Sequence, residues 1–397
     1  MTEIAGIGTY LPAWGTATVR QTGDDEDAVT LAVAAGRAAR TAAGPDVAVS
    51  CVVLVSRDLP LIEGGNAAPV LAGLDLDEHI HVREVIGGSA AALDEVAAAG
   101  PGTLVIGADA TGAAGASAVL CGGTGRTVTV TGRVVRSLPV TTRDQHGTTT
   151  DYADPRLLRE RGVGESLARL GNPATAAVAG LAGKDAAALC GGPAPVLPTT
   201  GASATGFAIA ALAVRAGSVI AVDQATVTVA ELSGPPPPVV RDEPEPQPRP
   251  AGTLAPGASV SISLSAYERA FDAKVRLAAG RCAACGSLSL PPRRRCIDCG
   301  SEAPADLAPL PRDATIYSLA TIHVPVPGLV SPYTIVIAEL GDTGVRTIAK
   351  LTGAPPGSVA IGDRGTLVLR LVAVRQGVPD YGYGFLPVHR GARGVAA

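Results

Sequence analysis

Aromatic residues are scarce in this chain of 397 residues, which contains three Phe, one Trp and seven Tyr. Sites for single-stranded nucleic acid stack bases on aromatic side chains, so this scarcity argues against such a site. Basic residues are not in excess either, because 32 Lys and Arg against 36 Asp and Glu give a net charge of −4. The sequence therefore lacks the chain-wide positive charge of a nucleic-acid-binding protein.

Long uninterrupted apolar runs are also missing. The longest uncharged stretch, Ala186–Val214, contains three prolines and four glycines, whereas a bilayer helix needs about 20 predominantly apolar residues in succession. The first basic residue is Arg20, so the start of the chain lacks the positive charge of a secretory signal. We therefore expect no membrane association and a cytoplasmic location.

The apolar content is ample, at 47% against 17% charged residues, which is typical of a folded protein. The clearest domain boundary lies at Gly234–Pro250, where eight of seventeen residues are proline and five are charged. Because proline lacks an amide hydrogen and fixes φ, we expect an extended spacer that forms neither helix nor internal sheet. The predicted division is residues 1–233, a linker at 234–262, a cysteine-rich segment with its leading helix at 263–302, and a β-rich domain at 303–390.

The part before the linker alternates short apolar runs with Ala-rich stretches. The runs predict buried strands at Ser50–Val55, Thr103–Gly107 and Val219–Val222. The Ala-rich stretches predict helices at Asp24–Arg40, Ser89–Ala99 and Ser203–Arg215. This alternation favours a layered α/β fold. The sequence from Leu104 to Gly123 also resembles that from Ser218 to Leu232, as a strand ending in Asp followed by a second strand, which favours a duplicated α/β unit.

After the linker the pattern becomes β-rich. An amphipathic helix is predicted at Ser265–Leu277. Five strands follow, at Thr315–His323, Tyr333–Leu340, Arg346–Leu351, Gly365–Val374 and Tyr383–Leu386. Five short strands behind a helix fit a small barrel of the OB type.

Four of the seven cysteines lie within eighteen residues, as Cys282, Cys285, Cys296 and Cys299. Each CxxC pair can place two thiolates on one edge of a tetrahedral Zn²⁺. Four thiolates leave no open coordination position, so the sequence predicts a structural zinc. A redox dithiol pair and an iron centre are the alternative interpretations of such pairs.

Arginines surround these cysteines, at Arg281, Arg293, Arg294 and Arg295. Such a group can bind nucleic acid, capture the phosphates of a ligand such as coenzyme A, or simply form a solvated loop. A run of charges alone favours the solvated loop.

The C-terminal half resembles the zinc-ribbon plus OB-fold family called DUF thirty-five. The resemblance rests on YERAFDAKVRLAAG, RCAACGSLSLPPRRRCIDCG, SPYTIVIAEL and YGYGFLPV, and it runs in order from Tyr267 to Val388. It implies binding of acyl-CoA thioesters beside a thiolase-type or hydratase-type partner. It also assigns Arg293, Arg294 and Arg295 to the phosphates of coenzyme A.

The N-terminal half resembles hydroxymethylglutaryl-CoA synthases and type III ketoacyl synthases of the thiolase superfamily, in a shortened form. The resemblance rests on AGIGTYLP, DEDAVTLAVAAGRAA, EVIGGSAAAL and TTGASATGFAIAAL. It implies a layered fold built from a duplicated α/β unit, and assembly as a homodimer or with a thiolase-type protein.

The superfamily's catalytic residues are not found at the matching positions. Where the resemblance implies a nucleophilic Cys at a helix start, the sequence is Ile86-Gly87-Gly88-Ser89. Where it implies Asn-Thr-Gly, the sequence is Thr199-Thr200-Gly201. Ser89 and Thr199 are therefore positional candidates only.

Three functions follow as hypotheses. The first is an acyl-CoA-binding protein of a thiolase-type complex that makes or breaks C–C bonds. The second is an autonomous acyltransferase or retro-aldolase with relocated groups, for which Cys121, Cys190, Ser89 and the tyrosines 152, 381 and 383 are candidates. The third is a nucleic-acid-binding zinc-ribbon/OB protein, which the scarcity of aromatic residues makes remote.

Overall fold

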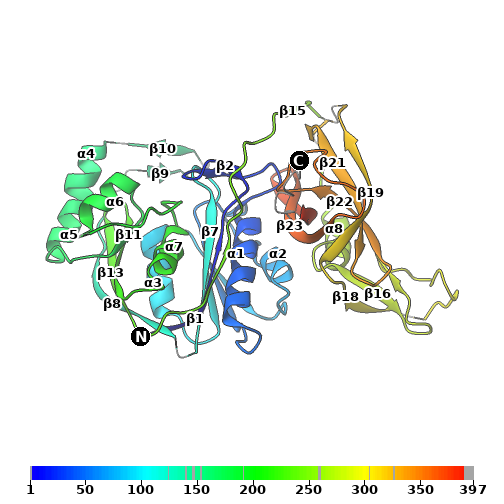
Figure 1. Cartoon of the computed structure of the whole chain (residues 1–397), viewed down its shortest axis with the longest axis horizontal. Helices are drawn as coiled ribbons and strands as arrows, with labels where there is room; N and C mark the ends of the chain where they lie inside the picture. The colour runs from blue at the N-terminus through cyan, green and yellow to red at the C-terminus, as the bar shows by residue number, and fades with distance from the viewer. Residues whose placement is uncertain are drawn as a thin grey trace, which may run out of the picture.

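The computed structural model describes residues 2–123, 125–138, 141–144, 148–152, 154–190, 192–257, 261–303, 305–324 and 327–388. A layered α/β domain forms one side of the molecule, and a barrel with a projecting ribbon forms the other (Figure 1). None of the helices in these ranges combines the length and apolar character that a bilayer span requires.

The first half of the α/β domain contains β1 (Thr2–Tyr10), β2 (Trp14–Gly15), β3 (Arg20–Gln21), α1 (Ala28–Ala43), β4 (Cys51–Val55), α2 (Ala67–Gly73), β5 (His81–Val85), α3 (Ser89–Ala98), β6 (Thr103–Asp109) and β7 (Gly115–Cys121). The second half contains β8 (Arg126–Val134), β9 (Thr141–Arg143), β10 (Thr149–Asp151), α4 (Pro155–Leu157), a π-helix (Leu158–Gly164), α5 (Glu165–Arg169), β11 (Ala177–Ala179), α6 (Gly183–Leu189), α7 (Ala204–Ala211), β12 (Gly217–Asp223) and β13 (Thr226–Ser233).

The rest of the chain contains β14 (Val239–Asp242), β15 (Thr253–Leu254), α8 (Leu264–Lys274), β16 (Ala278–Cys282), β17 (Leu288–Ser289), β18 (Ala305–Pro309), β19 (Asp313–Ile322), β20 (Val330–Ser331), β21 (Tyr333–Leu340), β22 (Arg346–Leu351), β23 (Arg364–Arg375) and β24 (Val378–Pro387). The five strands predicted for the barrel correspond to β19 and β21–β24, which close in the order β19-β21-β22-β24-β23. The predicted small β-barrel is confirmed.

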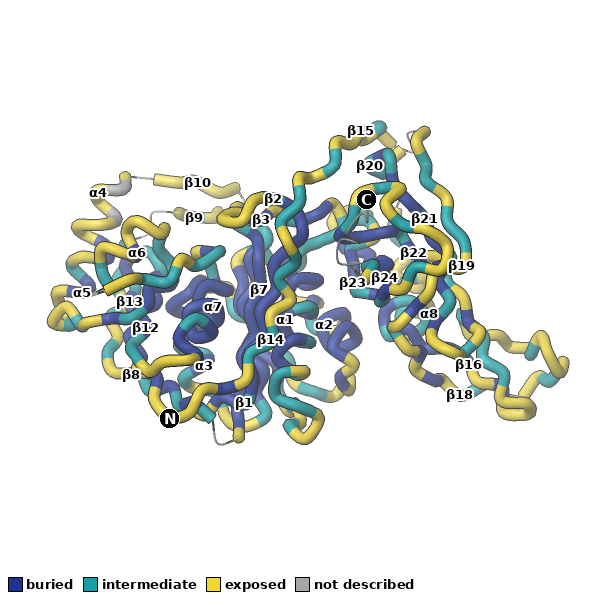
Figure 2. Tube along the Cα trace, viewed as in Figure 1, coloured by how far each residue is buried: buried dark blue, intermediate teal, exposed yellow. Residues whose placement is uncertain are grey.

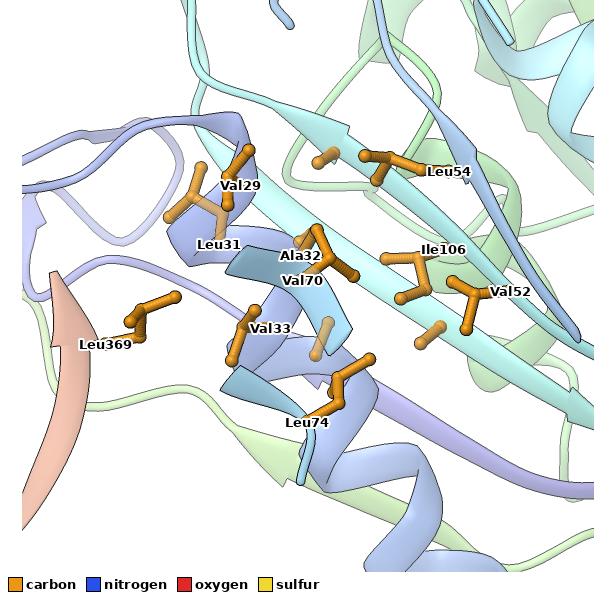
Figure 3. Close-up of a cluster of buried hydrophobic side chains, with 14 of the residues drawn as sticks. Val29, Leu31, Ala32, Val33, Val52, Leu54, Val70, Leu74, Ile106 and Leu369 are labelled. Atoms are coloured by element: carbon orange, nitrogen blue, oxygen red, sulfur yellow. The ribbon is translucent and has the colours of Figure 1, made fainter. Parts of the chain in front are cut away.

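The α/β domain has five layers: α1 with α2, a sheet region, α3 with α7, a second sheet region, and α5 with α6. The alternating side chains of the strands show which helices cover each face. Val52 and Leu54 of β4 pack with α1 and α2 on one face, as Figure 3 shows for part of that cluster, whereas Val53 and Val55 pack with α3 and α7 on the other. The same two helices also cover Val219 and Ala221 of β12, whose neighbour Ile220 faces the outer layer of α5 and α6. Helices α3 and α7 are therefore enclosed between two sheet regions, and the predicted layered α/β fold is confirmed.

The predicted duplication is visible as two antiparallel hairpins. Strands β6 and β7 pair in the first half, and β12 and β13 pair in the second. Both halves belong to a ten-stranded sheet, in which nine strands run in the order β11-β12-β13-β8-β1-β7-β6-β4-β5 and the tenth, β14, pairs with β1. They join where the first residues of β1, Thr2–Ile4, pair with β8.

Glycine explains why the AGIG motif can lie under α1. A Cβ atom at Gly8 would lie 2.2 Å from the backbone nitrogen of Ala39, and one at Gly6 would lie 2.5 Å from that of Ala43. Any side chain would push the helix off the strand. Helix α1 itself begins after the acidic run rather than within it, because the Asp27 carboxylate accepts from the Thr30 N–H at 2.9 Å and caps the helix.

The proline-rich segment departs from the prediction that it forms no internal sheet. Val239–Asp242 is strand β14, which pairs in parallel with Ile7–Tyr10 of β1. These residues have amide hydrogens and lie between two runs of prolines, so the argument from proline does not apply to them. They occupy the part of the β1 edge that lies beyond the β8 pairing.

A buried polar cluster connects the barrel to helix α1. Arg370 of β23 forms an ion pair with Glu26 at 3.3 Å, and the two side chains are only 5% and 4% exposed. Its guanidinium also donates to the hydroxyl of Tyr10 at 3.2 Å. Tyr381 of β24 donates to the second carboxylate oxygen of Asp27 at 2.6 Å. We call these residues, Tyr10, Glu26, Asp27, Arg370 and Tyr381, the junction cluster.

Apolar and backbone contacts continue this junction. Leu369 of β23 belongs to the same core as Val33 of α1 and Leu74 (Figure 3). The Leu371 N–H donates to the Asp25 carbonyl at 2.9 Å. Burial alone would lower the pKa of Arg370, but the neighbouring Tyr10, Glu26 and Asp25 outweigh burial and raise it. The barrel is thus fixed on the α/β domain through a charged, desolvated contact.

We expect Arg370→Met to lower the free energy of unfolding by about 3–5 kcal/mol, because it leaves the Glu26 carboxylate buried without its cation. Urea unfolding followed by circular dichroism measures the effect. Arg364→Met is the matched control, since Arg364 is exposed at the start of the same strand, and it should change the value by less than about 0.5 kcal/mol. Equal effects of the two variants would contradict the assigned role of the cluster.

Candidate functional site

The four predicted cysteine ligands lie together in the ribbon formed by β16, β17 and β18. The Sγ atoms of Cys282 and Cys299 are 3.7 Å apart, and those of Cys285 and Cys296 are 3.6 Å apart. All four sulfur atoms lie within 4.8 Å of one another. Tetrahedral zinc with Zn–S bonds of about 2.3 Å separates its sulfurs by about 3.8 Å, so this donor set fits zinc.

Two equivalent turns produce this geometry. In each one, the N–H after the second cysteine bonds back to the carbonyl of the first: Gly286 to Cys282 at 2.8 Å, and Gly300 to Cys296 at 3.1 Å. Both glycines have positive φ, 76° and 72°. A residue with a Cβ is strained in that conformation, which is why glycine follows each CxxC pair.

Arg293, Arg294 and Arg295 are exposed on the ribbon loop between the two turns. Arg295 donates to the Gly300 carbonyl at 3.2 Å and so helps to hold the second turn. The ribbon projects from the barrel on the side away from the α/β domain, and its loop is exposed (Figure 2). These arginines therefore face outward, and their predicted role at coenzyme A phosphates stays a prediction.

Ser89 stands at the start of α3, in the enclosed layer of the α/β domain. It is 1% exposed, and its hydroxyl donates to the Gly201 carbonyl at 2.5 Å. The preceding N–H, of Gly88, donates to the Asp223 carboxylate at 3.0 Å. The Ser89 hydroxyl and the Gly88 N–H therefore already have hydrogen-bond acceptors within this chain.

Thr199 lies in a related arrangement at the start of α7. It is 1% exposed, and its hydroxyl is 2.7 Å from that of Ser203. Asp109 accepts from the Ser203 hydroxyl at 2.5 Å and from the N–H groups of Ala202 and Ser203 at 2.8 and 2.9 Å. Sequence analysis identified Ser89 and Thr199 but not these carboxylates, although each is the Asp that ends a repeated strand, Asp109 in β6 and Asp223 in β12.

The other candidate nucleophiles and acids have structural surroundings. Cys121 is fully buried in β7, and burial raises the pKa of its thiol to about 12. Burial also raises the pKa of Cys190, which follows α6. The hydroxyl of Tyr383 donates to the Val275 carbonyl at 2.8 Å, and that of Tyr381 belongs to the junction cluster. Tyr152 is 60% exposed on the surface.

We expect the purified chain to hold about one zinc ion, measured by inductively coupled plasma mass spectrometry. Cys296→Ser should lose most of that zinc, whereas Cys190→Ser, outside the ribbon, should retain it. Zinc content should fall as the pH is lowered, because protons compete with the metal for the thiolates. Full zinc retention by Cys296→Ser would contradict the assignment.

The ribbon and the barrel match known family models. The model "ChsH2, rubredoxin-like zinc ribbon domain" matches residues 273–305, and "ChsH2, C-terminal OB-fold domain" matches residues 308–370. Among curated proteins, no match was found.

Solved structures similar to the chain include two kinds. One is entitled "Ltp2-ChsH2(DUF35) aldolase", at 27% identity over 33% of this chain and 98% of that one, with a TM-score of 0.26. The second group includes 3-oxoacyl-(acyl carrier protein) synthase III, FabH, from Pseudomonas aeruginosa PAO1, at 16% identity over 60% of this chain and 99% of that one, TM-score 0.44. It also includes an OleA variant from Xanthomonas campestris, at 14% identity over 58% and 98%, TM-score 0.47.

Over residues 273–305 and 308–370, the family models agree with the resemblance of the C-terminal half to a zinc-ribbon plus OB-fold family. The chain thus combines a layered α/β domain with a four-cysteine zinc ribbon and a closed five-stranded barrel that match the ChsH2 domain models.

Proposed function

We propose that this chain is an acyl-CoA-binding component of a thiolase-type complex in which a partner carries out the C–C bond chemistry. In this proposal the thiolase-like domain has no nucleophile of its own and acts as scaffold and interface. The partner is a thiolase-type protein, and a homodimer of this chain is the alternative assembly. The ChsH2-type ribbon and OB-fold domain support the association with acyl-CoA metabolism.

The observation that carries the proposal is the start of helix α3. A thiolase-type nucleophile needs a thiolate at this position, stabilised by the helix dipole and by unoccupied N–H groups. Here Ser89 is buried and donates its proton to a peptide carbonyl, which cannot act as a base. The Asp223 carboxylate, which is also ion-paired with Arg57, occupies the Gly88 N–H that would otherwise be free to stabilise a thiolate or an oxyanion.

The remaining residues of the chain support binding rather than bond making. A zinc with four thiolate ligands has no open position for water or a carbonyl oxygen, so it would hold the ribbon together without taking part in chemistry. Arg293, Arg294 and Arg295 are exposed and can donate to phosphate oxygens, as coenzyme A would require. The same arginines could contact nucleic acid, but no aromatic side chain lies among residues 281–302 to stack a base.

We expect the chain to bind decanoyl-CoA reversibly and to form no covalent acyl adduct, measured by isothermal titration calorimetry and intact-mass spectrometry. Ser89→Ala should leave binding unchanged, because the Ser89 hydroxyl serves only the α3–α7 contact. Thiolysis or condensation by the chain alone, or an acyl group mapped to Ser89, Cys121 or Cys190, would instead support the autonomous enzyme.

We also expect the double substitution Arg293→Glu and Arg294→Glu to weaken coenzyme A binding by about tenfold or more, since two charge-assisted contacts are lost. The difference should shrink as the salt concentration rises. Arg269→Glu, an exposed charge reversal on α8, is the control that should leave binding unchanged. If the double variant and Arg269→Glu bind coenzyme A with equal affinity, Arg293 and Arg294 do not contact the ligand.

A further inference from the structure

A groove lies on the outer surface of the barrel, where the α/β domain and the proline-rich segment approach it. The acidic loop before α1, with Asp24 and Asp25, forms one wall. The segment from Arg249 to Leu254 forms a second, and strands β21, β22 and β23 form the floor. The outer part encloses about 500 Å³, which is within the range of small-molecule sites. A smaller inner pocket beside Trp14 continues from it and shares five lining residues, Asp24, Asp25, Val330, Tyr333 and Lys350.

Most of the lining of the outer part of the groove is apolar. Strand β22 turns Ala349 and Leu351 into the barrel, so the alternate residues Ile348 and Lys350 face outward. Ile348 is 71% exposed, and Val374 of β23 and Leu254 of β15 are each 61% exposed. Together with Val372 they line the groove with aliphatic side chains that water now covers. An aliphatic ligand would remove this surface from water, at about 25 cal/mol per Å².

Lys350 is one of the charged residues that line the groove. It lines both the outer part and the inner pocket. Within the described ranges, the Lys350 ammonium forms no ion pair and no hydrogen bond. The other charged residues that line the groove have partners of opposite charge. Asp24 forms an ion pair with Arg249, and Arg370 forms one with Glu26. Asp25 also stabilises the charged form of Arg370.

We infer that this groove binds the acyl group of a thioester, with the aliphatic chain along Leu254, Ile348 and Val374 and the carbonyl oxygen accepting from Lys350. An uncharged carbonyl suits the site better than an anion does, because Asp25 lies in the same wall. The assignment rests on the proposed function for the nature of the ligand, and it adds the acyl class and the residue that recognises it. The ribbon arginines do not line the groove, so the groove accounts for the acyl end only.

The single tryptophan makes the site directly observable. Trp14 lines the inner pocket and is 8% exposed. Because Lys350 lines this pocket as well as the outer part, a thioester bound at Lys350 should change the fluorescence of Trp14. Two probes separate the acyl end from the phosphates: the decanoyl thioester of N-acetylcysteamine, which has no phosphate, and decanoyl-CoA. Both should saturate a change in Trp14 emission.

Lys350→Met should weaken both probes by about tenfold or more, the loss expected for one charge-assisted hydrogen bond. Lys184→Met is the matched control, because Lys184 is exposed on α6 in the other domain, and it should bind both probes like the original chain. Ile348→Asp should weaken both probes as well, by placing a charge against the aliphatic chain. Ile348 is largely exposed, so this variant should fold and should keep the measurement valid if Lys350→Met does not.

The outcomes separate the groove from the proposed function. Binding of decanoyl-CoA that neither changes Trp14 nor depends on Lys350 would overturn the groove while leaving acyl-CoA binding intact. Lys350-dependent binding of the N-acetylcysteamine thioester without binding of decanoyl-CoA would support the groove and contradict coenzyme A recognition. Failure of both probes to bind would overturn both.

Discussion

The position of the barrel depends on the buried ion pair between Arg370 and Glu26. It also depends on the hydrogen bond that Tyr381 donates to Asp27, the residue that caps helix α1. Two charges removed from water are tolerated only when each finds its partner, so this contact permits one orientation of the barrel on helix α1. Because α1 lies directly on the glycines of β1, the orientation is transmitted to the main sheet. The barrel is therefore part of one folded unit with the α/β domain.

The groove on the barrel lies beside this junction. The loop that supplies Glu26 and Asp27 supplies Asp24 and Asp25 to the groove, and β23 contributes Arg370 to the cluster and aliphatic residues to the groove floor. Recognition of a ligand and cohesion of the two domains thus use adjacent residues. The enclosed helices α3 and α7, in contrast, have their polar ends neutralised internally by Asp109 and Asp223.

Local sequence patterns predicted the regular elements and the metal ligands. The β-rich runs after the predicted helix located all five barrel strands, and the CxxC spacing found the four sulfurs that lie within 4.8 Å. Patterns could not predict the junction cluster, because Glu26 and Arg370 meet only through tertiary packing and each looks like an ordinary surface charge in sequence. Proline content likewise concealed β14, whose partner lies at the opposite end of the α/β domain sequence. Resemblance located Ser89, but only the structure gives its bond to Gly201.

Strand β14 has a consequence for how this chain can be divided. It covers the β1 edge from Ile7 to Tyr10, although it lies beyond the boundary that composition suggests at residue 233. A fragment ending there would expose a row of unsatisfied amides and carbonyls at the middle of its main sheet, and bare strand edges recruit other chains. Any excision of the front domain for expression should therefore extend through Asp242, because the apparent linker contains a strand of the domain it seems to follow.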